Sequence, residues 1–192
     1  APAGKVAMQK PFWGSGAAGY PFTTNGCGAG GLRVAVGPEL TPCCDLHDAC
    51  YAVCNASRAY CDNQFQACLS QRCKASGKPD CAQSARMLST GAATFGCGAF
   101  QSAQRDACEC GTRDEAAARF RETWRHLYRD VVGARKPAST VDSTVEKMLA
   151  HADPPRRAYG ALTKYPTELI RKEEKRGGDG DGPSLQSLFG EL

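Results

Sequence analysis

Cysteines take the apolar positions of a helical repeat in the first half of the chain. They recur four or seven residues apart, at positions 43, 50, 54, 61 and 68. This spacing predicts a helix that begins at Thr41-Pro42, with Thr41 as its cap and Pro42 in its first turn. One long helix would satisfy the repeat, but Asn55-Ala56-Ser57 favours a break, with a second helix from about Tyr60 to Cys73.

A third helix is predicted from Cys81 to Phe95, after a turn at Lys78-Pro79-Asp80. We expect this helix to return antiparallel to the helix that begins at Thr41. The predicted fold is therefore mainly α, with a core of disulfide-linked antiparallel helices.

Beyond residue 112 the apolar residues follow a helical period without cysteines. A first amphipathic helix carries Phe120, Trp124, Leu127 and Val131. A second, which Pro154-Pro155 ends, carries Val141, Val145, Met148 and Leu149. Thr167 to Arg176 suggests a short third helix, and residues 177–183 are predicted to form a flexible Gly-rich linker.

These patterns divide the chain into three parts. For residues 1–24 we predict an irregular N-terminal arm, since aromatic residues there stand among Gly and Pro: Phe12, Trp13, Tyr20 and Phe22. We expect these aromatic rings to pack on the core, with the entrance for a lipid chain as the alternative location. Residues 25–111 hold all the cysteines, and residues 112–192 form a helical C-terminal extension. We expect a basic line in this extension to dock on the protein itself, with anionic lipid as the alternative partner: Arg121, Arg125 and Arg129.

The composition is typical of a secreted protein. All 12 cysteines of the 192-residue chain lie between residues 27 and 110, and their even number suits a disulfide framework. No apolar run approaches the roughly 20 residues of a membrane span, and Ala1-Pro2-Ala3-Gly4 is typical of a mature N-terminus after removal of a signal peptide. A net charge of +4, with acids and bases interleaved, does not favour nucleic acid as a partner.

One stretch, Cys43 to Tyr51, combines a histidine and a carboxylate within the cysteine repeat. On a helix, Cys44, His47 and Tyr51 share one face, while Asp48 points about a quarter turn away. A base and a metal-binding carboxylate can then approach one reacting centre from adjacent directions. Upstream, residues 25–31 are rich in glycine, whose backbone can turn so that carbonyl oxygens converge, and calcium prefers such oxygen ligands.

These two motifs together resemble those of secreted phospholipases A2. The Cys27-Gly28-Ala29-Gly30-Gly31 segment is similar to the family's calcium loop, and Cys43 to Tyr51 is similar to its active-site helix. Residues 25 to about 111 are most similar to the group XII branch, including the cysteines Cys54, Cys61, Cys68, Cys73, Cys81, Cys97, Cys108 and Cys110. Residues 112–192 resemble no family that we can name.

The resemblance implies calcium-dependent hydrolysis of the sn-2 ester of glycerophospholipids, which releases a fatty acid and a lysophospholipid. His47 would be the general base that activates water. Asp48 and the backbone carbonyls of Gly26, Gly28 and Gly30 would bind Ca²⁺, and the Gly28 amide would help to stabilise the oxyanion. The expected partner is a phospholipid membrane or micelle surface that presents the fatty-acyl substrate.

Supporting roles follow from the same resemblance. We expect Cys44 to pair with Cys27 and hold the calcium loop against the helix, and Cys43 to pair with Cys97. Tyr51 would support the site through its hydroxyl, or else simply pack in the core. A zinc site of His47 and nearby cysteines is the competing metal hypothesis, although the C-x2-C pairs typical of zinc modules are missing.

One residue of the family pattern is not found where it is expected. In the family an aspartate on the antiparallel helix accepts the second ring N–H of the histidine, but residues 81–97 contain no carboxylate. Ser89, Thr90 or Gly91 lies near that position, and would stabilise an imidazolium less than a charged group does. A slower enzyme is then expected.

Two other functions remain open at this point. One is a weakly active or silent phospholipase-like module that binds membranes or proteins, and the other is a purely structural disulfide-rich protein. In either case the C-terminal helices could join copies of the chain into a homo-oligomer.

Overall fold

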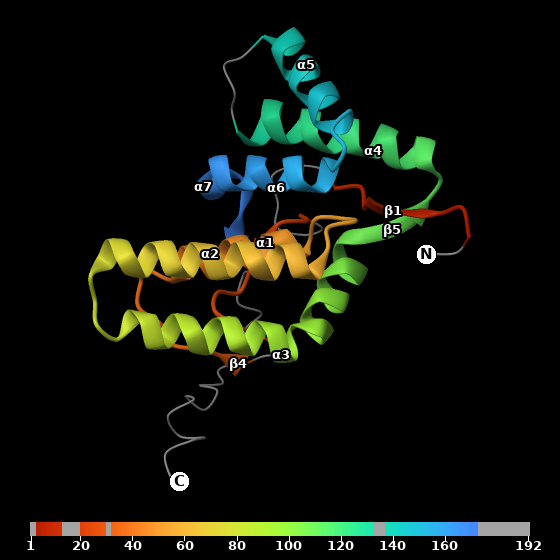
Figure 1. Cartoon of the computed structure of the whole chain (residues 1–192). Coiled ribbons are helices and arrows are strands. Elements are labelled where there is room, and N and C mark those ends of the chain that lie inside the picture. Colours follow the sequence, from red (N-terminus) through yellow and green to blue (C-terminus); the bar gives the residue numbers. More distant parts are fainter. Residues whose placement is uncertain (1–2, 13–19, 30–31, 133–136, 173–192) are drawn as a thin grey trace.

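The computed structural model describes residues 3–12, 20–29, 32–132 and 137–172 (Figure 1). The predicted Gly-rich linker at 177–183, Trp13 and Gly30 lie outside these residues. Three helices form the disulfide-rich part: α1 (Thr41–Tyr51), α2 (Arg58–Ser76) and α3 (Cys81–Ala107). The prediction of a mainly α fold is confirmed.

Helix α1 is antiparallel to α2, not to α3 as we predicted. Two disulfides fix this arrangement. Cys43 near the start of α1 pairs with Cys68 in the second half of α2, and Cys50 near the end of α1 pairs with Cys61 near the start of α2. The chain reverses between the two helices at Asn55, which has a positive φ of 64°, a conformation that asparagine adopts more readily than most residues. Ser57 then caps α2 by accepting a hydrogen bond from the Tyr60 amide.

Helix α1 begins at Thr41, as predicted, but Thr41 is not its cap. Leu40 occupies the cap position without a side-chain hydrogen bond, and Pro42 lies in the first turn. Proline is tolerated there because the first amides of a helix have no intrahelical acceptor.

Helix α3 packs on α2 and is longer than predicted, since it continues past Phe95 to Ala107. It leads into strand β5 (Cys108–Gly111), which pairs antiparallel with β1 (Val6–Gln9). The prediction of an irregular N-terminal arm is therefore wrong at residues 6–9. Polar and apolar residues in this short strand do not alternate clearly, so only its partner β5 makes it a strand.

The extension contains α4 (Arg113–His126), a π-helical turn (Leu127–Val131), α5 (Ala138–Leu149), α6 (Pro154–Lys164) and α7 (Pro166–Leu169). Helix α6 was not predicted, because Pro154-Pro155 suggested only the end of a helix. These prolines instead occupy its first turn, and the Asp153 side chain accepts a hydrogen bond from the Arg156 amide. In place of the predicted helix from Thr167 to Arg176, α7 ends at Leu169.

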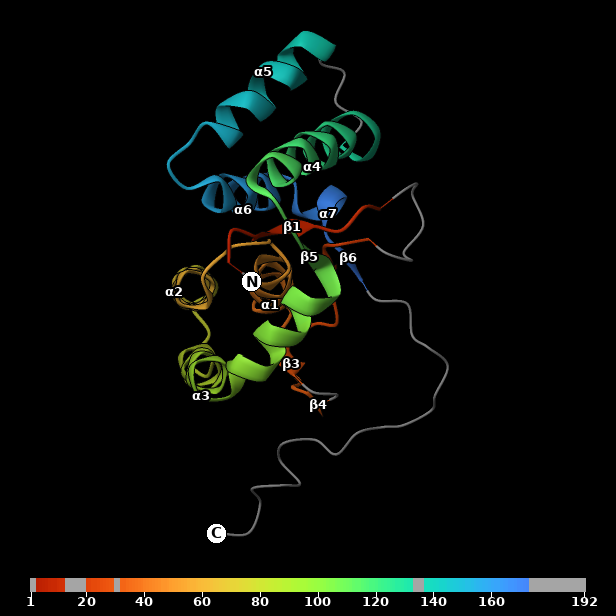
Figure 2. The ribbon, with the colours of Figure 1, turned by 90° about the vertical axis from the view of Figure 1, so that its right-hand side faces the viewer.

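One hydrophobic core joins the extension to the disulfide-rich part. Buried residues from α1 and from the extension belong to the same cluster: Ala49, Cys50, Tyr51, Trp124, Leu127, Leu162 and Leu169. Phe12, Tyr20 and Phe22 of the N-terminal arm complete it, so these three rings pack on the core. In both views the extension helices lie on one side of α1, opposite α3 (Figures 1 and 2).

Two small sheets flank the glycine-rich loop. Strand β3 (Gly28–Ala29) forms an antiparallel pair with β4 (Leu32–Arg33). Strand β2 (Thr23–Thr24), directly before the loop, pairs in parallel with β6 (Arg171–Lys172), the last described residues of the extension. The last described residues of the extension therefore lie beside the segment that leads into the loop.

All twelve cysteines lie in the described residues, and ten of them form five disulfides. Cys27–Cys44 is present as predicted, whereas the prediction of Cys43–Cys97 is wrong because Cys43 pairs with Cys68 on the neighbouring helix. The remaining bonds are Cys50–Cys61, Cys54–Cys108 and Cys73–Cys81. Cys97 and Cys110 are exposed and unpaired.

Peptide mapping under non-reducing conditions should return these five pairs. We expect Cys97 and Cys110 alone to react with an alkylating reagent in the unreduced protein, because both thiols are exposed. A peptide that links Cys43 to Cys97 would contradict the observed pairing of α1 with α2.

Replacing Leu162 by Ala should destabilise the whole chain. Leu162 is fully buried in the shared core, and such truncations cost about 2 to 5 kcal/mol. Phe95→Ala on exposed α3 is the control, since Phe95 is 77% exposed and surface changes usually stay within about 0.5 kcal/mol. Denaturant unfolding with the disulfides intact should show one transition, and separate unfolding of the extension would show that the core is not shared.

Candidate functional site

Helix α1 carries the candidate catalytic residues, and disulfides fix this helix to the segments on two sides of it. Cys44 joins it to the glycine-rich loop, while Cys43 and Cys50 join it to α2. The His47 side chain is buried, with 9% of its surface exposed. Its ring stacks on Phe65 at 4.3 Å between centroids and contacts the Tyr51 ring at 4.2 Å, so its orientation is held from two sides.

Asp62 on α2 is the orienting carboxylate that the sequence did not reveal. Its Oδ1 lies 2.9 Å from His47 Nε2. Because an ionised carboxylate only accepts hydrogen bonds, Nε2 carries the proton of the neutral ring and Nδ1 keeps the lone pair. The expectation that Ser89, Thr90 or Gly91 takes this position is wrong, because α3 is not the helix that faces His47.

The cysteine spacing held a signal for Asp62. Cys43 and Cys50 are seven residues apart, and so are Cys61 and Cys68. If the two pairs bond antiparallel, position 47 of the first helix falls opposite the turn that contains position 62. The sequence alone did not say which cysteines pair, so this register remained hidden.

Tyr51 supports the site through its hydroxyl, which donates a hydrogen bond of 2.6 Å to Asp62 Oδ1. Arg58 lies on the other side of the carboxylate, with Nε 3.9 Å from Oδ2. Asp62 is therefore contacted by the Tyr51 hydroxyl from α1, by the Arg58 guanidinium from its own helix and by the His47 imidazole. Tyr51 is also buried in the core, so both of its predicted roles are compatible with the structure.

Burial and the Asp62 charge act in opposite directions on His47. Burial lowers the pKa of His47 below its ordinary value, while the hydrogen bond and the negative charge of Asp62 raise it by a smaller amount. The net shift favours the neutral imidazole, the form that can accept a proton. Burial, with the same carboxylate, raises the pKa of Tyr51, so that Tyr51 remains a hydrogen-bond donor.

Asp48 faces the segment that leads into the glycine-rich loop. Its Oδ2 accepts hydrogen bonds from the Thr24 hydroxyl at 2.9 Å and from the Asn25 amide at 3.3 Å. Gly26 follows with a φ of 88°, which a residue with a side chain would rarely adopt. The Cys27–Cys44 bond holds the loop against α1. The Thr24 hydroxyl connects the Gly26 amide to Asp48, and Gly30 lies outside the described residues.

The chemistry of these groups fits calcium better than zinc. Asp48 and the loop backbone offer oxygen atoms, which hard cations prefer. Every cysteine close to His47 in the sequence is in a disulfide, so no thiolate is available for the zinc alternative. Among the described residues no three His, Cys, Asp or Glu side chains form a metal-binding cluster, so a calcium ion would depend on one carboxylate and on backbone carbonyls.

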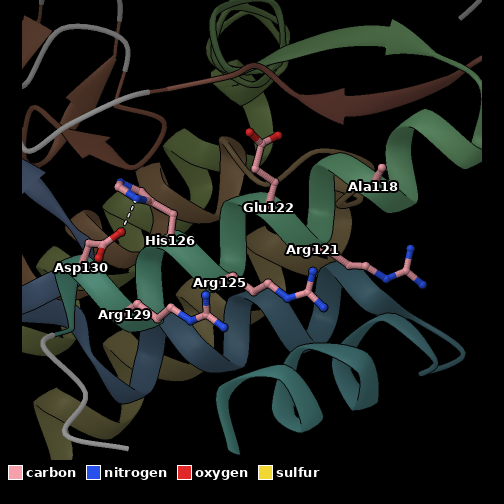
Figure 3. Close-up of a pocket in the computed structure, with 7 residues that line it drawn as sticks. All are labelled: Ala118, Arg121, Glu122, Arg125, His126, Arg129 and Asp130. Atoms are coloured by element: carbon pink, nitrogen blue, oxygen red, sulfur yellow. Dashed lines mark ion pairs between the residues drawn. The ribbon is translucent and has the colours of Figure 1, made fainter. Parts of the chain in front are cut away.

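A groove of the described surface lies away from this site. It runs along α4 and its π-helical turn, and is lined by Ala118, Arg121, Glu122, Arg125, His126, Arg129 and Asp130 (Figure 3). The three arginines point toward α5 and pair with its acids: Arg121 with Glu146, Arg125 with Asp142 and Glu146, and Arg129 with Asp142. This basic line therefore docks on the protein itself, as expected, and contributes nothing to the chemistry at His47.

No described helix has the length and apolar character needed to cross a membrane. The family model of the group XII secretory phospholipase A2 precursor matches residues 17–117, just over half of the chain. The human group XIIA secretory phospholipase A2 is 36% identical over 104 residues, which cover 48% of this chain and 55% of the human protein. The mouse group XIIA secretory phospholipase A2 is also 36% identical over 104 residues, with 48% and 54% covered.

The chain thus spans about half the length of the curated relatives that it matches. No solved structure shows a significant match to it. The matched residues contain α1, α2, α3 and the glycine-rich loop, and therefore every residue of the candidate site. The chain belongs to the group XII secretory phospholipase A2 family.

Proposed function

We propose that this protein is a secreted, calcium-dependent phospholipase A2 that hydrolyses the sn-2 ester of glycerophospholipids at a membrane or micelle surface. The observation that carries this proposal is the contact of 2.9 Å between His47 Nε2 and Asp62 Oδ1. With Nε2 donating to Asp62, the basic nitrogen of His47 is Nδ1. Asp48, on the same helix, faces the segment that leads into the glycine-rich loop.

His47 is the general base of the proposed reaction. Its Nδ1 takes a proton from water as the water oxygen attacks the ester carbonyl carbon, and Asp62 stabilises the imidazolium that forms. When the ester C–O bond breaks, His47 returns the proton to the departing glycerol oxygen. The products are a fatty acid and a lysophospholipid, and the imidazole is again neutral.

Asp48 and the backbone carbonyls of Gly26, Gly28 and Gly30 are the proposed calcium ligands. Bound calcium would polarise the ester carbonyl and stabilise negative charge on its oxygen. The Gly28 amide would donate a hydrogen bond to the same oxygen. The disulfide between Cys27 and Cys44 keeps the two sets of ligands at a fixed separation.

A weakly active or silent membrane- or protein-binding module was the alternative, supported by the missing orienting aspartate and by the long extension. Asp62 fills that role, so we place hydrolysis first. Secretion is supported by the five disulfides and by the secretory relatives. Assembly of copies through the C-terminal helices remains a prediction.

Removing the proposed calcium ligand or the base should abolish hydrolysis. In release of fatty acid from phospholipid vesicles, we expect Asp48→Asn and His47→Gln to lose at least about 10²-fold in kcat/KM, a typical effect of losing such a group. Excess chelator should have the same effect on the unchanged chain. Phe95→Ala, at an exposed position to which we assign no part in the reaction, should keep full rate. Undiminished activity in chelator would contradict the calcium requirement.

Replacing Asp62 by Asn should lower kcat by about 10²-fold or more while KM changes little, because the uncharged amide no longer stabilises the imidazolium and can favour the wrong tautomer. Tyr51→Phe is the matched control, since it removes one hydrogen bond to Asp62 but keeps the ring beside His47. We expect that variant to lose less than about tenfold, in keeping with one hydrogen bond of about 1 kcal/mol. Equal kcat for Asp62→Asn and the unchanged chain would refute the role of Asp62.

A further inference from the structure

The last described residues of the extension form a strap over the segment that leads into the glycine-rich loop. We define the strap as residues 169–172. The Tyr20 hydroxyl donates to the Leu169 carbonyl at 2.9 Å, and the Arg171 amide donates to the Phe22 carbonyl at 3.0 Å. The Arg171 guanidinium also lies 3.8 Å from the centre of the Tyr20 ring. These contacts hold β6 in register with β2, with Lys172 beside Thr24.

Thr24 connects the strap to the candidate calcium site. It is buried, with 3% of its surface exposed. Its hydroxyl lies 2.9 Å from Asp48 Oδ2 and 2.8 Å from Asp45 Oδ1, and it accepts a hydrogen bond from the Gly26 amide at 3.1 Å. One side chain therefore contacts both the carboxylate on α1 and the backbone of the loop.

A hydroxyl has one hydrogen, so Thr24 can donate to only one of the two carboxylates at a time. The two aspartates stand one turn apart on α1 and converge on this single group. Thr24, together with the Asn25 amide, thus helps to hold the Asp48 carboxylate relative to the loop. Small displacements of β2 would move the donor away from both aspartates, and β2 has β6 as its strand partner.

We propose that Thr24 is a positioning residue for Asp48, and that the strap sets the calcium affinity of the site by holding Thr24 in place. The inference rests on the proposed function only in that Asp48 binds calcium. Groups that hydrogen-bond to a metal ligand orient it, and their loss typically costs about 10- to 100-fold in metal affinity. The extension would then act on the site without supplying a ligand.

Calcium titration of the full chain by calorimetry tests the role of the hydroxyl. We expect Thr24→Val, which keeps the shape but removes the donor, to weaken calcium binding about 10- to 100-fold. Thr24→Ser restores the hydroxyl and should bind calcium close to the wild-type affinity. Calcium affinity of Thr24→Val equal to that of wild type would overturn the inference, and so would equal losses in Thr24→Val and Thr24→Ser.

The strap is tested by Arg171→Pro, which removes the amide that donates to Phe22, against Arg171→Lys, which keeps the amide and a positive charge. Only the proline variant should lose calcium affinity by a factor comparable to that of Thr24→Val. Wild-type affinity in Arg171→Pro would overturn the role of the strap.

Hydrogen exchange of the unchanged chain provides a test that needs no altered fold. Because coupling between two sites is reciprocal, calcium should slow exchange of the Arg171 amide in the wild type but not in Asp48→Asn. Identical exchange with and without calcium, in a chain that binds calcium, would contradict the inference alone. A wild-type chain that binds no calcium would instead refute the proposed function on which the inference rests.

Discussion

The antiparallel register of α1 and α2 is the constraint on which the rest of the site depends. Cys43–Cys68 and Cys50–Cys61 set this register at two points. Seven residues are close to two helical turns, so each helix presents both of its cysteines on one face. The loops that these bonds close span 25 and 11 residues, and the chain-entropy model assigns each bond about 3 kcal/mol. With the register held, Asp62 can only lie beside His47.

The His47–Asp62 contact is a compromise between burial and charge. Burial alone disfavours an imidazolium, yet the proposed reaction passes through one. Asp62 supplies the opposing charge at 2.9 Å, while the Tyr51 hydroxyl and Arg58 satisfy the rest of the carboxylate. These contacts join His47, Asp62, Tyr51 and Arg58 into one connected cluster between α1 and α2.

The extension is part of the fold that builds the site. Trp124, Leu127, Leu162 and Leu169 bury the same core as α1, and β6 reaches back to β2 beside the loop. Arg121, Arg125 and Arg129 pair with the acids of α5 within the extension. Arg156 instead lies over the Tyr60 ring of α2, which adds a link to the disulfide-rich part. One shared core therefore joins the extension to the helix that carries His47 and Asp48.

Local patterns were enough to predict the helices that carry strong periodicity, and they singled out the glycine-rich loop, His47 and Asp48 as candidates whose catalytic roles stay predictions. The pairing of Cys27 with Cys44, which the structure contains, came from the family resemblance and not from these patterns. They missed β1 and β6, which are strands only because distant segments pair with them. They also missed α6, because Pro154-Pro155 was interpreted as the end of one helix and is in fact the first turn of the next. Only the tertiary structure decided which residue partners His47 and how the extension reaches Thr24. Both depend on which distant segments pack together, and the order of residue types along the chain is compatible with more than one such packing.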